Sequence, residues 1–222
     1  MRRSLVLALA LAFVMLLSPG RVAAQGEQAA TPAAAVLPEA CQVEPRAAEE
    51  VFALLGMTEG TEGAAVPADR TPVPAPPWLA ADPDTVTAVT ATTAEWLACI
   101  NADDNLRIAA LMTDSAIVRF FGGALAPDEA IEGARTNLTG TPTPRPEEGH
   151  AHLVAVTDVS RLDDGRVAAL ALINEPVLPP QGQETLLLLF AQDGDRLLID
   201  DIVQFSVVPV AGGTPAAGTP QP

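Results

Sequence analysis

The chain has 222 residues, and its 12 basic residues are all arginines, set against 28 Asp and Glu for a net charge of −16. An acidic surface of this kind repels nucleic acid and anionic lipid, so we expect no nucleic-acid partner. The chain contains no lysine and no tyrosine, which excludes catalysis through a lysine Schiff base or a tyrosine acid. The same bias is typical of a GC-rich bacterial genome.

The first residues have the pattern of an export signal. A basic start at Met1–Arg3 precedes an apolar run from Leu5 to Leu17 and a small-residue stretch that ends at Ala24. We therefore predict a signal peptide over residues 1–24, cut after Ala24, and a secreted or extracytoplasmic protein. The apolar run is too short to span a membrane, so we expect no membrane attachment after cleavage. The cut leaves 9 arginines against 28 acidic residues, a net charge of −19.

Residues 25–40 are rich in Ala, Pro and Gln and are typical of a disordered linker. Residues 41–82 then form the predicted N-terminal extension, with a short amphipathic helix over Pro45–Leu55 followed by a proline-rich strap. Trp78, near the end of the strap, is expected to anchor the strap against the long helix that follows. The alternative is that Trp78 forms an aromatic wall of a ligand pocket.

Cys41 and Cys99 are the only cysteines of the chain. An even pair in an exported protein predicts a disulfide, which would tie the extension to the long helix. Lipid modification of Cys41 is less consistent with its distance from the apolar run, and two cysteines without a cluster of histidines make a poor zinc site.

The pattern from residue 83 onward predicts a long helix. Apolar and small residues recur at spacings of three and four, with Asp82 or Asp84 as the N-cap. The sequence Asn-Ala-Asp-Asp at residues 101–104 predicts the end of this helix and a cap at Asp104 for a short second helix. The run Ala116–Phe121, β-branched and aromatic, favours a strand.

A third helix is expected near Pro127–Ile131, followed by a loop from Thr139 to Gly149 that could cover the mouth of a cavity. Four strands follow, with turns at Asp-Asp-Gly and Asp-Gly-Asp sequences: Ala151–Leu162, Arg166–Glu175, Glu184–Asp193 and Arg196–Val208. These strands are apolar on both faces. One face would take the helices, and the other would be covered by the extension or by a second copy, which predicts a homodimer through the sheet. Residues 209–222 are predicted to be a disordered tail.

This order of elements resembles the nuclear transport factor 2-like, or SnoaL-like, superfamily of cystatin-like α+β cones. The resemblance rests on the helix, the Asn-Ala-Asp-Asp corner, Leu106-Arg107 with Ala-Ala-Leu-Met, the third helix, and a last strand containing Arg196–Asp201. It implies an α+β fold over residues 83–208, in which a curved, mainly antiparallel sheet wraps around a long N-terminal helix. Asp103 stands where the family usually has glycine. The tyrosines used by ketosteroid isomerase and scytalone dehydratase are absent, so their mechanisms do not transfer.

Asp201 is the most specific candidate for a catalytic residue. Strict alternation places it on the same strand face as Ile199 and Val203, in an apolar row. A buried carboxylate without a compensating cation can act as a general base. The structural alternative is that Asp201 pairs with Arg119 or Arg107.

His150 and His152 would share a strand face, but the pattern supplies no third ligand, so we assign no metal site and no cofactor.

The sequence thus predicts an exported, non-catalytic protein. It would bind a small apolar ligand or act as an extracytoplasmic interaction module, and the candidate cavity residues are Trp96, Arg107, Arg119 and Asp201. The alternative is a cofactor-free isomerase, dehydratase or cyclase with Asp201 as general base, and Arg119 or Arg107 stabilising developing negative charge.

Overall fold

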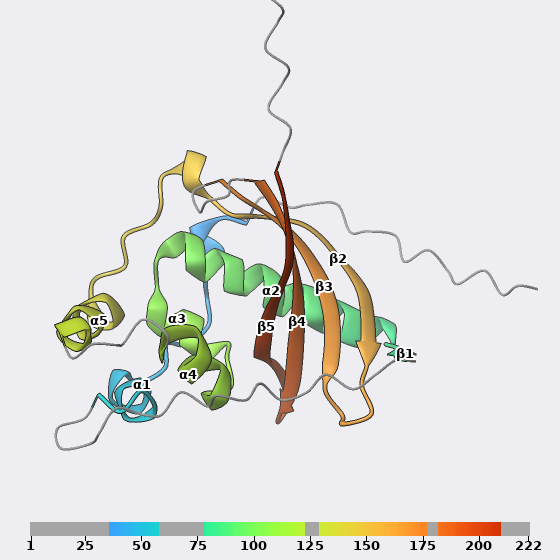
Figure 1. The fold of residues 1–222 in the computed structure, drawn as a ribbon, viewed down its shortest axis with the longest axis horizontal. Coiled ribbons are helices and arrows are strands. Elements are labelled where there is room, and N and C mark those ends of the chain that lie inside the picture. Colours follow the sequence, from blue (N-terminus) through green and yellow to red (C-terminus); the bar gives the residue numbers. More distant parts are fainter. Residues whose placement is uncertain (1–35, 58–77, 123–128, 177–181, 210–222) are drawn as a thin grey trace, which may run out of the picture.

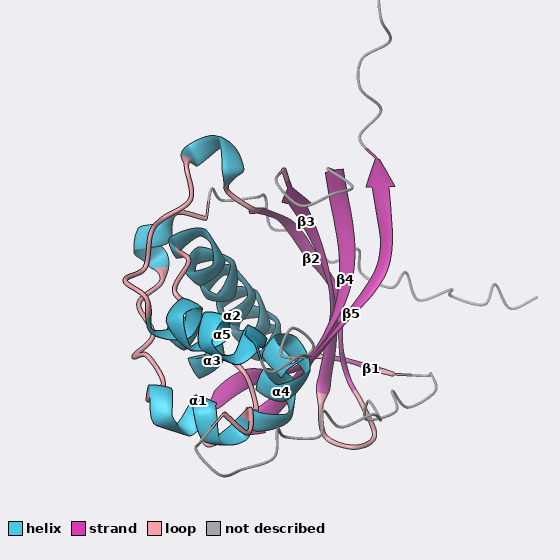
Figure 2. Ribbon diagram, turned by 60° about the vertical axis from the view of Figure 1, so that its left-hand side comes forward, coloured by secondary structure: helices cyan, strands magenta, loops and turns pink. Residues whose placement is uncertain are grey.

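The structure, a computed structural model, describes residues 36–57, 78–122, 129–176 and 182–209. They form an α+β fold in which a curved, open, five-stranded antiparallel sheet in the order β1-β2-β3-β4-β5 carries the helices on one face (Figures 1 and 2). The strands are β1 (Leu79–Ala80), β2 (His152–Arg161), β3 (Val167–Glu175), β4 (Gly182–Asp193) and β5 (Arg196–Pro209). The four strands predicted from the sequence are therefore present, whereas β1 lies at the end of the predicted strap.

The described helices are two short 3-10 helices and five α-helices: η1 (Pro38–Ala40), α1 (Ala48–Leu54), α2 (Pro83–Ala102), α3 (Asn105–Ala110), α4 (Asp114–Gly122), α5 (Glu129–Thr139) and η2 (Glu147–Gly149). Residues 36–40 belong to the predicted linker, but Val36 is buried and η1 packs on α2. The predicted signal peptide, the rest of the predicted linker, most of the predicted strap and the residues after Pro209 lie outside the described residues. No helix in the described ranges has the length and apolar character needed to cross a membrane.

The two ends of α2 are capped as the sequence predicts. The Asp82 side chain accepts a hydrogen bond from Thr85 N (2.9 Å), and Pro83 occupies the first turn. At the other end Asp103 adopts the left-handed conformation, with φ of 55°. The Asp104 side chain then caps α3 by accepting from Arg107 N. Aspartate tolerates the left-handed region because its side chain is short and polar, so the chain turns here without glycine.

The prediction of a strand over Ala116–Phe121 is wrong, because these residues lie in α4. Thr113 Oγ1 accepts a hydrogen bond from Ala116 N (3.2 Å), as an N-cap does, and Asp114 occupies the first turn. The helical spacing buries Ala116 and Ile117 in the core. Capping and burial have overridden the strand preference of Ile, Val and Phe.

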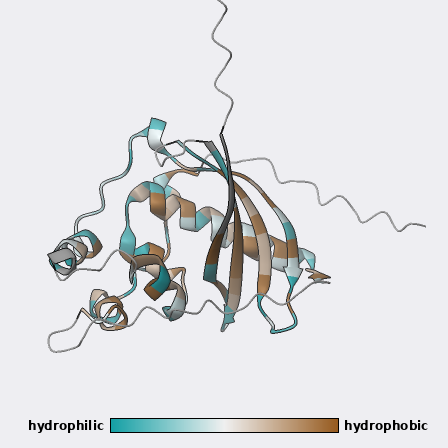
Figure 3. Ribbon diagram, viewed as in Figure 1, coloured by the Kyte–Doolittle hydropathy of each residue, from teal (hydrophilic) through white to brown (hydrophobic). Residues whose placement is uncertain are grey.

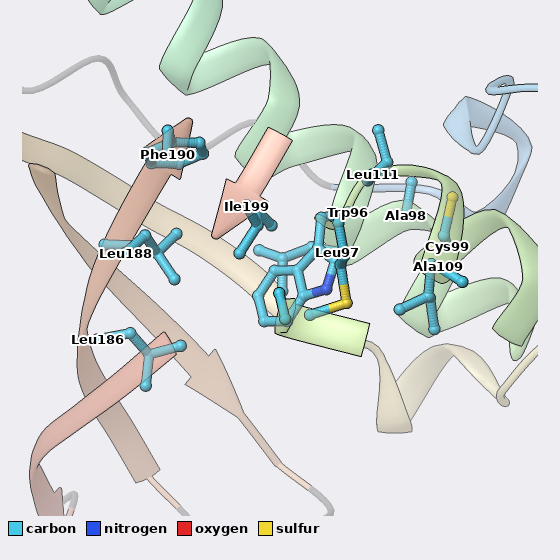
Figure 4. Packing of buried hydrophobic residues seen from close by; sticks show 14 of the residues in the cluster. Trp96, Leu97, Ala98, Cys99, Ala109, Leu111, Leu186, Leu188, Phe190 and Ile199 are labelled. Carbon is cyan, nitrogen blue, oxygen red and sulfur yellow. The ribbon is translucent and has the colours of Figure 1, made fainter. Parts of the chain in front are cut away.

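The main core lies between the helices and one face of the sheet. Figure 4 shows Leu186, Leu188 and Phe190 along β4, with Trp96 of α2 and Ile199 of β5 among the core side chains beside them. Apolar colouring accordingly concentrates on the strands and on α2 (Figure 3).

A second, smaller cluster occupies the opposite face of the sheet. It contains Leu162, Ala168, Leu187 and Leu189, with Trp78 packed against it. The expected packing of Trp78 on α2 is therefore replaced by packing on the sheet.

The disulfide predicted from the two cysteines is present. Cys41 and Cys99 are joined across 58 residues of sequence, and both are buried. The bond fastens the extension to α2, as expected. Arg107 adds a hydrogen bond from its Nη1 to Cys41 O (3.2 Å).

Candidate functional site

A cavity of about 480 Å³ opens between α2 and the helix-covered face of the sheet. Its apolar wall comes from the helices and from β3, β4 and β5, and includes Trp96, Leu97, Ile108, Ile173, Leu186 and Ile202. The volume falls within the range of small-molecule sites, which are mostly apolar with a few placed polar groups. Of the predicted cavity residues, Trp96 is the one that lines this space.

Charged side chains line the same cavity. Asp103, Glu175 and Glu184 contribute carboxylates, and Arg145 contributes one guanidinium. Arg145 Nη1 lies 3.3 Å from Glu175 Oε2, in an ion pair whose carboxylate is only 6 % exposed. Asp103 is exposed and Arg145 and Glu184 are half-buried, whereas Glu175 is buried. We call these four residues the charged rim.

The Trp96 indole is the polar group within the apolar part of this wall. Trp96 is 3 % exposed, and its Nε1 has no hydrogen-bond acceptor among the described residues. Its ring meets Phe120 edge to face, with centroids 6.5 Å apart. Buried indole N–H groups usually find a partner, so this donor is an exception, and it is itself shielded from solvent.

Arg119 and Asp201 line a different and smaller pocket, of about 220 Å³, at the edge of the sheet beside α4. Arg119 Nε lies 3.4 Å from Asp201 Oδ1, and the same oxygen accepts a hydrogen bond from Ile202 N (2.9 Å). Asp201 is 4 % exposed. Phe120 and Ile202 line both pockets, so the two pockets adjoin. The structural alternative for Asp201, pairing with Arg119, is the geometry found.

The predicted strand face of Asp201 is wrong because β5 contains a bulge. Ile199 lies opposite Phe190, but Asp201 lies opposite Leu189, with Asp200 as the extra residue. Phe190 belongs to the main core and Leu189 to the second cluster. A bulge breaks the two-residue alternation, so Asp201 does not continue the row that contains Ile199.

Asp200 is held by a polar network. Its Oδ1 accepts hydrogen bonds from Thr113 Oγ1 (3.0 Å) and Ser115 Oγ (3.3 Å), and its Oδ2 lies 3.3 Å from Arg166 Nη1. Arg119 Nη2 donates to the Asp200 backbone carbonyl. These contacts fix α4 to the bulge of β5.

Arg166 also pairs with Asp164 at 2.7 Å. Its hydrogen bonds lower the pKa of the Asp164 carboxyl and, in turn, Asp164 raises the pKa of Arg166. Both groups are therefore held charged, which is a structural arrangement and not that of an acid or base poised near neutrality.

The remaining candidates lie away from the cavity. Arg107 is half-buried, with its Nε 3.7 Å from Asp104 Oδ2, and it supports the turn between α2 and α3. His150 is buried and its Nε2 lies 2.9 Å from Arg145 O, whereas His152 begins β2. In the described part of the chain, no three His, Cys, Asp or Glu side chains lie together as a metal site would require.

Sequence reasoning missed the charged rim, although two of its members carried a signal. Glu175 and Glu184 interrupt apolar strands at corresponding ends, since Glu184 lies opposite Ile173 and Glu175 lies opposite Gly182. Arg145 lies in the loop that we expected to cover a cavity mouth, and its place in the wall required the tertiary structure.

We compared the chain with family models, with curated proteins and with solved structures, and none of them matches it.

Proposed function

We propose that the chain is an exported protein with a SnoaL-like cone domain, and that its cavity binds a small, largely apolar ligand without transforming it. One observation carries the proposal: a cavity of about 480 Å³, lined mostly by apolar side chains, lies between α2 and the sheet. An apolar wall with a few polar groups in its lining is the usual composition of a binding site for a small organic molecule.

Two further parts of the proposal, export and the cone architecture, have indirect support. The sequence pattern of residues 1–24 supports export, and the Cys41–Cys99 disulfide is consistent with an oxidising compartment. A long helix, α2, against a curved antiparallel sheet supports the cone architecture. The homodimer through the sheet remains a proposal that the oligomeric state in solution would test.

The test of ligand binding is native mass spectrometry on the protein secreted from its own host. We expect a reproducible extra mass of small-molecule size that is lost on denaturation. Ile173→Trp, which fills the cavity from β3, should abolish the extra mass. Leu170→Trp is the matched control, because Leu170 lies on the same strand but packs against the second cluster. A bare wild-type protein, or a mass retained in Ile173→Trp, would contradict the proposal.

The enzymatic alternative has one observation in its favour: Asp201 and Arg119 meet in a pocket that shares Phe120 and Ile202 with the cavity. A general base must reach the proton that it removes. If the wild-type protein converts the ligand released from it and Asp201→Asn does not, the protein is an enzyme. If neither converts it, the non-catalytic function stands.

A further inference from the structure

A second apolar pocket adjoins the cavity. It has a volume of about 200 Å³ and lies where α4 and α5 meet the ends of α1 and α3, four helices that Figure 1 shows grouped together. Its described lining contains no charged side chain: the apolar surface comes mainly from Leu55, Phe121, Ala134 and Leu138, and the polar residues are Asn105 and Asn137. We call this space the helical pocket.

Phe120 lies where the cavity and the helical pocket meet, because both Phe120 and Asn105 line the two spaces. The Phe120 ring contacts Trp96 of the cavity edge to face, with centroids 6.5 Å apart. It contacts Phe121 of the helical pocket in the same way, at 5.0 Å. The three rings therefore form a continuous apolar surface that leads from one space into the other, and the ring at its centre is 44 % exposed.

The pocket of Arg119 and Asp201 also adjoins the cavity at Phe120, but it differs in its lining. The ion pair between Arg119 and Asp201 is nearly buried, and an aliphatic chain would remove its remaining contact with water without offering a hydrogen bond. Such desolvation costs free energy. An apolar chain that leaves the cavity at Phe120 is therefore expected to enter the helical pocket.

From this arrangement we propose that the ligand carries a long aliphatic chain, which crosses the Phe120 ring and ends in the helical pocket. This inference rests on the proposed function, which it narrows from apolar ligands in general to molecules with such a chain. A bound chain would cover the exposed ring, and removal of apolar surface from water is the main source of affinity for a hydrocarbon. A ligand confined to the cavity would leave the helical pocket unused.

The experiment compares primary alcohols from hexanol through decanol to tetradecanol, which differ only in the number of methylene groups. Binding is followed by tryptophan fluorescence in a Trp78→Phe background, because Trp78 packs on the other face of the sheet and its removal leaves Trp96 as the only tryptophan of the exported chain. Each methylene group that becomes buried should lower the Kd about fourfold. We expect this gain to continue through the longest alcohols.

Two substitutions on α5 make a matched pair. Ala134→Phe fills the helical pocket, whereas Thr136 is an exposed residue of the same helix outside the pocket lining. Ala134→Phe should bind hexanol as the background protein does and tetradecanol about tenfold more weakly, the loss of roughly two buried methylene groups. Thr136→Phe should alter neither. Asn137→Phe, at an exposed residue of the pocket lining, blocks the same space from the solvent side and should act as Ala134→Phe does.

The outcomes separate this inference from the proposed function. If the Kd of every alcohol is unchanged in Ala134→Phe and Asn137→Phe, the helical pocket takes no part in binding and the long-chain specificity is wrong, while the cavity stands. The specificity is also wrong if these variants weaken hexanol as much as tetradecanol, or if Thr136→Phe weakens tetradecanol equally. If no alcohol changes the fluorescence of Trp96, both proposals fail. A loss confined to the longer alcohols and to the two blocking variants supports both.

Discussion

Asn101 offers the sharpest test of how the fold is held together. It is fully buried near the end of α2. Its Nδ2 donates to Val36 O and to Ala151 O, each at 2.9 Å, and its Oδ1 accepts from Ala151 N at 2.8 Å. One side chain thus joins the segment before η1, the helix α2 and the residue that precedes β2. Because Val36 and Ala151 are themselves buried, water cannot replace these bonds.

Asn101→Leu keeps the branched skeleton of the side chain but removes its donor and acceptor. The Ala151 N–H and two carbonyls would lose a partner, and we expect a loss of about 4 kcal/mol, given about 1–3 kcal/mol for each buried group left unpaired. That is a large part of the roughly 5–15 kcal/mol by which a domain of this kind is stable. Urea denaturation of the oxidised protein measures the difference.

The matched control is Asn105→Leu. Asn105 begins α3, and its Nδ2 donates to Asn137 O at 3.1 Å in an exposed position. Water can replace that bond, so the substitution should cost less than about 1 kcal/mol. If Asn101→Leu lowered the free energy of unfolding as little as Asn105→Leu does, the three hydrogen bonds of Asn101 would contribute little to stability and the reasoning would be refuted.

Three other perturbations have defined outcomes. Replacing Cys41 and Cys99 by serine should lower the free energy of unfolding by about 4 kcal/mol through the entropy of the opened loop, and the reduced wild-type protein should denature at the same urea concentration as this variant. The Arg161 side chain and, second to it, the backbone N–H of Thr85 lower the pKa of Asp82 from its ordinary value of 3.8. The stability that the ionised Asp82 contributes is therefore present above pH 3.8 and lost as the pH falls below it. Arg161→Gln should flatten this acid dependence in equilibrium unfolding, as Asp82→Asn does. Asp201→Asn should cost about 3 kcal/mol in urea denaturation by breaking a buried ion pair, and should leave decanol binding unchanged; a stable variant with altered binding would place Asp201 at the ligand.

Much of the fold follows from local sequence. Asp82, Asp103 and Asp104 mark the ends of α2 and α3 because caps act through neighbouring backbone groups. The two hairpin turns follow from Gly165 and Gly194, which both have positive φ, a conformation that glycine adopts without a steric penalty. Such signals depend on a few consecutive residues and can be recognised before any tertiary contact is known.

The predictions that are wrong concern residues whose structure depends on contacts with residues distant in the sequence. Ala116–Phe121 has strand composition, but the cap from Thr113 and burial beneath the sheet edge make it helical. The two-residue alternation along β5 predicts the strand face of Asp201, and the bulge interrupts that alternation. At that point the bridge between Met112 and Ile199 and the network around Asp200 hold α4 against the strand. The Trp78 side chain packs on the sheet because the second cluster presents an apolar surface there.

The candidate site was predicted only in part. Trp96 was expected in a cavity from its place on the buried face of a helix, which periodicity reveals. Arg119 was expected in the same cavity, but its side chain reaches Asp201 in the neighbouring pocket. The rim combines a loop residue, Arg145, with Glu184 of β4, and no pattern along the chain links the two.

The disulfide also makes part of the chain a covalent ring. The bond between Cys41 and Cys99 closes a loop across 58 residues, so a protease that cuts one peptide bond inside the loop opens the ring without producing two molecules. The buried sulfurs keep α1 and the extension attached to α2 after such a cut. An exported protein that meets extracellular proteases would in this way remain one molecule after a single cut in the segment between α1 and α2.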